Sequence, residues 1–239
     1  MKLDRYDAFF ESSDDLSEQD KQELAPYVID RFDGSTDLFF KEMKENLPEA
    51  FNSLKENYSA PRIGRWRISA SPRPMYDLIL ESERDFIVGS MHNENFHDLY
   101  NLDDIYKMIP SGLRHYYYAV QGLQFVTDKN PSINWLNLPP SVSQARDILD
   151  YAKALNYDTR SARKMVKATP YKYLSTWIVF DSGSCLFTSS IEGDRIYFVD
   201  NGDFNNFELL EDPVQDISKY LAHVFSGKKP QDYVFNQHS

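Results

Sequence analysis

The stretch that decides the fold is residues 177–227, WIVFDSGSCLFTSSIEGDRIYFVDNGDFNNFELLEDPVQDISKYLAHVFSG. Residues 174–180, 185–190 and 195–199 are apolar runs rich in β-branched and aromatic residues, and turn-forming residues separate them. The pair Asn201-Gly202 predicts a tight hairpin turn after the third run, because both residues readily adopt positive φ angles. We therefore expect consecutive antiparallel hairpins here.

The same stretch ends in a well-delimited amphipathic helix. Asp212 is a favourable N-cap, Pro213 suits the first helical position, and Gly227 is a typical helix end. The apolar residues between them recur at helical spacing: Val214, Ile217, Leu221, Val224 and Phe225. A closing helix that packs on the hairpins is the prediction.

The first sixty residues favour helices with an acidic outer face and an aromatic inner face. Ser17, with Asp20 three residues later, predicts the N-cap of one helix that continues to Gly34. Thr36 is the expected cap of the next helix, which Pro48 interrupts. Residues 51–58 continue a helical pattern.

The middle of the chain mixes both periodicities. Short apolar runs at 77–81 and 85–89 predict a hairpin. Helices are expected at 102–108 and 111–121, the second ending at Gly122, followed by a strand and loop over 125–138. A further helix with its apolar face between Ala145 and Leu155 leads into an exposed basic connection that ends at Pro170.

These elements predict the α+β class, with an antiparallel central sheet flanked by helices and a mainly helical N-terminal elaboration. Residues 1–100 form that elaboration, and residues 101–239 form the α+β domain. Because no Pro/Gly/Ser-rich linker divides the chain, we expect both parts to share one core.

Composition narrows the function classes. A formal net charge of −11 disfavours nucleic acid as a partner and suits a partner with a basic face. The single Cys185 fits a reducing compartment, and neither a signal peptide nor a membrane span is expected, so a cytoplasmic location is predicted. Within this acidic chain, the cluster of Arg62, Arg65, Arg67 and Arg73 favours internal ion pairs.

The chain has no strong catalytic signature, so we expect neither an enzyme nor a bound cofactor. The best candidate for a metal or acid–base site is His92, Glu94 and His97. On a helix, histidines five residues apart point in different directions, which favours a polar surface loop over a metal site. Residues 200–206 have the composition of a calcium loop but lack its helix–loop–helix context, so a hairpin turn is preferred.

The sequence Ile109-Pro110-Ser111-Gly112-Leu113-Arg114-His115-Tyr116-Tyr117, followed by Gln121-Gly122-Leu123, resembles the opening motif of the SUKH superfamily, LP-x-x-L-x-x-F/Y…NG. Residues 195–200 and 207–210 and the final helix are similar to its late strands and closing helix. The resemblance spans residues 100–227. Gln121 stands where the family usually has Asn, the helix near Ile148 is an insertion, and the first hundred residues have no counterpart.

The resemblance implies an immunity protein that binds a cognate bacterial toxin and blocks its active site. Acidic residues could then match a basic active-site surface on the toxin. The candidate contacts at the hairpin tips are Asp181, Glu192, Asp194, Asp200 and Asp203, with Tyr197 and Phe204 as aromatic anchors. Two alternatives stay open, which are a small-ligand- or metal-binding enzyme with a site around His92, Glu94 and His97, and a regulatory scaffold on the same fold.

Overall fold

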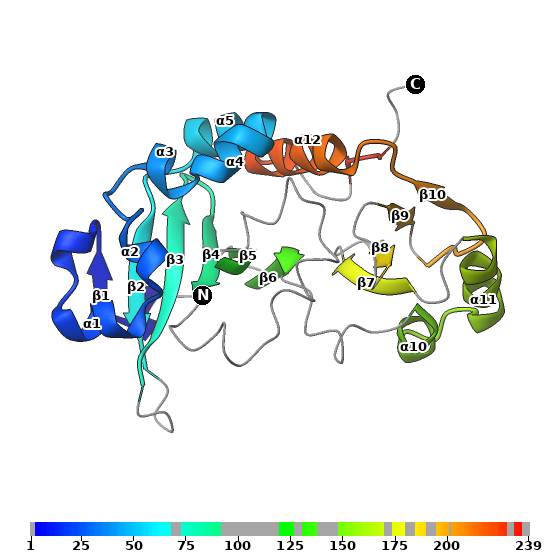
Figure 1. Cartoon of the computed structure of the whole chain (residues 1–239), viewed down its shortest axis with the longest axis horizontal. Coiled ribbons are helices and arrows are strands. Elements are labelled where there is room, and N and C mark those ends of the chain that lie inside the picture. The colour runs from blue at the N-terminus through cyan, green and yellow to red at the C-terminus, as the bar shows by residue number, and fades with distance from the viewer. Residues whose placement is uncertain are drawn as a thin grey trace.

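The computed structural model describes residues 3–67, 73–91, 120–126, 131–137, 148–169, 174–179, 185–189, 195–200, 202–228 and 232–235. In this part of the chain, ten strands form two antiparallel sheets and helices pack around them (Figure 1). The predicted α+β class with antiparallel pairing is confirmed.

The larger sheet has six strands in chain order. They are β1 (Tyr6–Phe10), β2 (Arg62–Trp66), β3 (Met75–Glu81), β4 (Phe86–Met91), β5 (Val120–Val126) and β6 (Pro131–Asn137). The pairing of β3 with β4 confirms the predicted hairpin. The predicted helix end at Gly122 is wrong, because residues 120–122 already belong to β5. Hydrogen-bonding partners on both sides, β4 and β6, override the local helical spacing there.

The smaller sheet has the order β10-β9-β8-β7. Its strands are β7 (Leu174–Val179), β8 (Cys185–Ser189), β9 (Ile196–Val199) and β10 (Phe207–Leu209), and β7 contacts β6 of the larger sheet. The predicted hairpins are confirmed, but the predicted tight turn at Asn201-Gly202 is wrong. Val199 pairs with Phe207, so the connection spans residues 200–206. Phe204 is buried within this connection, and a two-residue turn could not return a ring to the core.

Five short helices follow β1: α1 (Glu18–Glu23), α2 (Pro26–Ile29), α3 (Thr36–Phe39), α4 (Lys41–Asn46) and α5 (Pro48–Asn57). The predicted cap is confirmed, since Ser17 and Asp20 form a reciprocal capping box. The prediction of one continuous helix from Ser17 to Gly34 is wrong, because Leu24 has an extended backbone and Pro26 starts a new helix. The cap of α3 is Ser35 rather than Thr36, because the Ser35 hydroxyl accepts from the Leu38 N–H at 3.1 Å.

Three helices belong to the second half: α10 (Ile148–Ala154), α11 (Thr159–Ala168) and α12 (Pro213–Phe225). The predicted α12 has its expected Asp212 cap and Gly227 end. The predicted exposed basic connection is wrong, because α11 occupies it. Asp158 caps α11, and Ala162 and Met165 bury one face while the basic residues stay exposed on the other.

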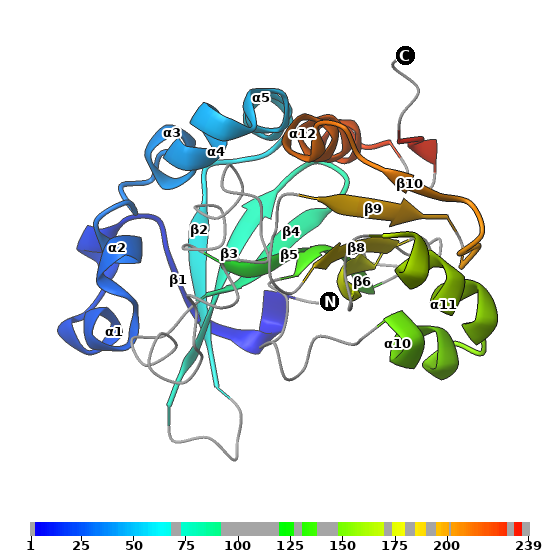
Figure 2. The same cartoon turned by 45° about the vertical axis from the view of Figure 1, so that its right-hand side comes forward.

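One core cluster joins the two ends of the chain. Strand β9 contributes Ile196, which packs with the N-terminal helices and α12, while Tyr197 and Val199 face a second cluster with α10 and α11. The smaller sheet is therefore covered on both faces. Figures 1 and 2 show α12 beside α5, in one row of helices along the sheets. The Ser53 hydroxyl donates to the Ala222 carbonyl across this helix pair at 2.9 Å.

Candidate functional site

The structure describes only part of the predicted contact set. Asp181, Glu192 and Asp194 lie outside the described residues, and so do His92, Glu94 and His97 of the alternative site. The segment 109–117 that carries most of the SUKH resemblance also lies outside them. Tyr197, Asp200, Asp203 and Phe204 are described, and they all belong to the β9–β10 hairpin.

The two aromatic residues are not surface anchors. Tyr197 is 4% exposed and Phe204 is 1% exposed, and both belong to the core cluster on the α10–α11 side of the sheet. The Phe204 ring lies edge-on to Tyr157, with 6.2 Å between ring centroids. This burial corrects the prediction that either ring is presented to a partner, and it assigns both to stability.

The acidic residues of the same hairpin are at the surface. Five carboxylates on the hairpin and the turn into α12 are exposed, and we call them the acidic rim: Asp200, Asp203, Glu208, Glu211 and Asp212. Asp203 also holds the connection together, accepting from the Asn205 N–H at 3.2 Å and the Asn206 amide at 2.7 Å. Asp212 accepts from the Gln215 N–H at 3.1 Å.

Glu208, Glu211 and Asp212 belong to the rim but were not among the predicted contact residues. Their signal was present in the sequence. Glu208 is a charged residue between the apolar Phe207 and Leu209, so its side chain points to the other face of the strand. Asp212 is a polar N-cap directly before Pro213. Only the pairing of β10 with β9 shows that they extend the acidic surface begun by Asp200 and Asp203.

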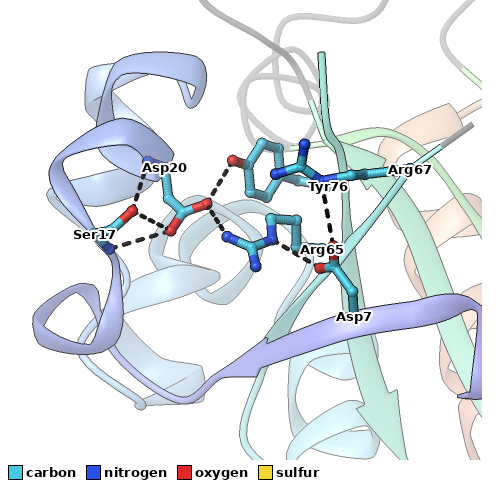
Figure 3. Close-up of polar contacts among 6 residues, drawn as sticks. All are labelled: Asp7, Ser17, Asp20, Arg65, Arg67 and Tyr76. Atoms are coloured by element: carbon cyan, nitrogen blue, oxygen red, sulfur yellow. Dashed lines mark hydrogen bonds and ion pairs between the residues drawn. The ribbon is translucent and has the colours of Figure 1, made fainter. Parts of the chain in front are cut away.

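A second polar cluster, the Asp20 cluster, ties α1 to the larger sheet (Figure 3). Asp20 is 2% exposed and accepts from Arg65 at 3.0 Å, from the Tyr76 hydroxyl at 2.8 Å and from the Ser17 hydroxyl at 2.6 Å. Asp7 on β1 binds Arg65 at 2.8 Å. The Asp20 cluster consists of six residues, which are Asp7, Ser17, Asp20, Arg65, Arg67 and Tyr76.

These contacts confirm the predicted internal pairing of the arginines. Arg65 and Arg67 both bind Asp7, and Arg62 binds Glu81 at 2.6 Å. Burial acts to raise the pKa of Asp20, but the hydrogen bonds from Ser17, Tyr76 and Arg65 outweigh it and leave the pKa lowered. Asp20 is therefore an ionised structural anchor.

Asp77 on β3 is, with Asp20, one of two buried carboxylates among the described residues, at 1% exposure. It forms an ion pair with Arg5 and accepts from the Tyr6 hydroxyl at 2.9 Å. Burial raises the pKa of Asp77, and the charge of Arg5 acts in the opposite direction. The Arg5 guanidinium also lies over the Tyr6 and Trp66 rings, at 4.8 and 4.7 Å from their centroids. Both buried carboxylates are thus used to join β1 or α1 to the sheet.

Among the described residues, no group of three His, Cys, Asp or Glu side chains is placed to hold a metal ion. Within the same residues, no helix has both the length and the apolar character needed to cross a membrane. The sequence matches no family model, no curated protein and no solved structure. The SUKH resemblance therefore stays a prediction from the motif.

Proposed function

We propose that this chain is a cytoplasmic immunity protein that neutralises a cognate bacterial toxin by covering its active site, with no chemistry of its own. The observation that carries the proposal is the acidic rim. Between residues 195 and 216, six acidic residues stand against one base, Arg195. On and beside β1 and β2, by contrast, Arg5, Arg62, Arg65 and Arg67 are each paired with a carboxylate.

This distribution gives the protein an acidic surface on a rigid support. The rim lies on a hairpin whose Tyr197 and Phe204 rings are buried and on the capped start of α12, so the backbone that carries its carboxylates is fixed before a partner arrives. Complementary charge accelerates encounter with a basic surface and disfavours acidic partners. Toxins that act on nucleic acid or nucleotides are often basic around the active site, and the carboxylates would stand in for phosphates there.

The test is co-expression with the product of the neighbouring gene, if that gene encodes a secreted effector. We expect the chain to restore growth of cells that express the effector and to form a stoichiometric complex with it in size-exclusion chromatography. Failure to protect and to bind would contradict the proposal. Bound metal that is lost on His92→Ala and His97→Ala would instead favour the alternative enzyme.

A matched pair of variants tests the rim. Glu208→Gln with Glu211→Gln removes two charges from the rim, whereas Glu45→Gln with Glu56→Gln removes two exposed charges from α4 and α5. We expect the first pair to slow association about 3- to 10-fold at low salt and the second pair to have little effect. Equal effects of both pairs would show that net charge, rather than the rim, governs binding.

A further inference from the structure

The outer edge of β10 has no strand partner within the part of the chain that the structure describes. Strand β10 is the last strand of its sheet, and none of the described residues pairs with its outer side (Figure 2). The Leu210 N–H donates to the Ile196 carbonyl at 2.9 Å, so the next hydrogen-bonded pair in the ladder is Glu208 with Phe198. The backbone N–H and C=O groups of Phe207 and Leu209 between them therefore point away from β9.

The two faces of this edge differ in chemistry. Glu208 pairs with Phe198 and is exposed on the face that α12 covers. Leu209 is 43% exposed on the opposite face, beside the Phe207 ring that packs on Tyr197. A strand laid along β10 would thus meet a carboxylate on one face and an apolar surface on the other.

Strand β1, an edge strand of the larger sheet, lacks these properties. The register of β1 shifts between Tyr6 and Ala8, which is a bulge at Asp7, and bulges discourage strand addition at an edge. Asp7 is also engaged by Arg65 and Arg67. Strand β10 is the better template of the two.

We propose that β10 binds its partner by strand addition, and that the occupant is an extended segment of alternating basic and apolar residues. The outward N–H and C=O groups of Phe207 and Leu209 supply the hydrogen bonds, and the acidic rim selects the basic residues. A second copy of this chain is disfavoured as occupant, because it would bring its own Glu208 and Glu211 against the same carboxylates. This inference deepens the proposed function by naming how the toxin would be held, and it rests on that function.

The probe is the fluorescent peptide Lys-Val-Lys-Val-Lys-Val, whose binding does not depend on any toxin. In an added antiparallel strand, valines oppose Phe207 and Leu209 and donate to them, while lysines share the face of Glu208 and direct their N–H groups outward. N-methylation of the valines should therefore abolish binding, and N-methylation of the lysines should preserve most of it. Loss of binding on methylation of the lysines only would also support strand addition, with the peptide parallel to β10. Equal effects of the two methylations, or no binding of the unmethylated peptide, would overturn the inference.

Two protein variants complete the test. Leu209→Pro removes an outward N–H without removing a ladder bond to β9, and we expect it to raise the Kd of the peptide at least about 5-fold, the equivalent of one hydrogen bond. Its unfolding transition should stay close to that of the parent, which shows that the strand is intact. Glu208→Gln with Glu211→Gln should weaken the lysine peptide at low salt, and the peptide Glu-Val-Glu-Val-Glu-Val should not bind.

The outcomes separate the two proposals. If the chain protects cells from a toxin but Leu209→Pro protects equally well and no peptide binds, strand addition is wrong and the immunity function stands. If the peptide binds as described but no toxin is neutralised, the immunity function is wrong. If the parent chain forms a dimer that Leu209→Pro does not form, the occupant of β10 is a second copy of the chain. That result would overturn the choice of a basic and apolar partner segment.

Discussion

Arg65 on β2 donates a hydrogen bond to Asp20 on α1 at 3.0 Å, although 45 residues separate them in the chain. The same guanidinium binds Asp7 on β1 through its Nε at 2.8 Å. One side chain therefore holds an edge strand and the first helix to the sheet. Because Asp20 is buried, its charge depends on these partners, and their loss should be costly.

Asp20→Asn should lower the free energy of unfolding by about 2–4 kcal/mol, because it removes the charge that binds Arg65, Tyr76 and Ser17 and leaves these groups with a weaker acceptor. Urea denaturation at pH 7 measures it. Glu18→Gln, an exposed change in the same helix, is the control and should cost less than about 0.5 kcal/mol. Similar losses in both variants would contradict the anchoring role.

The effect of Asp20→Asn should depend on pH. The pKa of Asp20 is lowered in the folded protein, so its stabilising contribution is present above the ordinary carboxyl pKa of about 3.9 and is lost as the pH falls through the lowered value. The stability difference between parent and variant should therefore be largest at pH 7 and shrink at about pH 3. Parallel urea titrations at the two pH values measure this change.

Asp77→Asn should show the opposite trend. Burial raises the pKa of Asp77, so the contribution of its titration is fully present below the ordinary carboxyl pKa and is lost as the pH rises through the raised value. The stability of Asp77→Asn relative to the parent should therefore be more favourable at pH 7 than at low pH. The same sign of pH dependence in both variants would contradict the two assignments.

Gly227→Ala should destabilise the protein by about 1–3 kcal/mol. Gly227 has φ of +84°, and an added Cβ would lie 1.5 Å from the Arg84 guanidinium, which donates to the Ser226 carbonyl at 3.1 Å. Thermal unfolding measures the loss, with the exposed neighbour Lys228→Ala as control. The double variant with Arg84→Ala should relieve the clash but keep the φ strain, so the two changes should not be additive.

Met165→Ala tests whether α11 is a packed helix. Met165 is buried against the smaller sheet, so truncation should cost about 2–4 kcal/mol, whereas Lys164→Ala on the exposed side should be nearly neutral. Chemical denaturation of the two variants gives the comparison. If both substitutions have equally small effects, residues 159–168 are an exposed connection, as their composition suggests, and not a packed helix.

Local signals in the sequence located much of the fold. Apolar runs of β-forming residues and turn residues placed the strands of the smaller sheet, and Ser17 and Asp212 marked helix starts correctly. Pro48 marked the predicted interruption, where α4 ends and α5 begins, because capping and proline effects act within a few residues. In α11, basic residues outnumber the small buried stripe of Ala162 and Met165, so the composition concealed the helix.

The long-range relationships could not be predicted in the same way. The capping role of Asp20 is visible from Ser17, but its partners Arg65 and Tyr76 come from other strands. Likewise, an aromatic residue in a turn-like segment, such as Phe204, is equally compatible with presentation to a partner and with burial. Only the longer connection, which returns the ring to α10 and α11, decides between them.

The pairing of α12 with α5 sets an order of events during synthesis. The ribosome completes the N-terminal helices more than 150 residues before α12, which lies against α5 and shares its core. Until residue 225 has left the exit tunnel, Phe51 and Leu54 lack part of their cover, and the nascent chain exposes an aromatic surface. We therefore expect chains interrupted before α12 to depend on chaperones and to be degraded early.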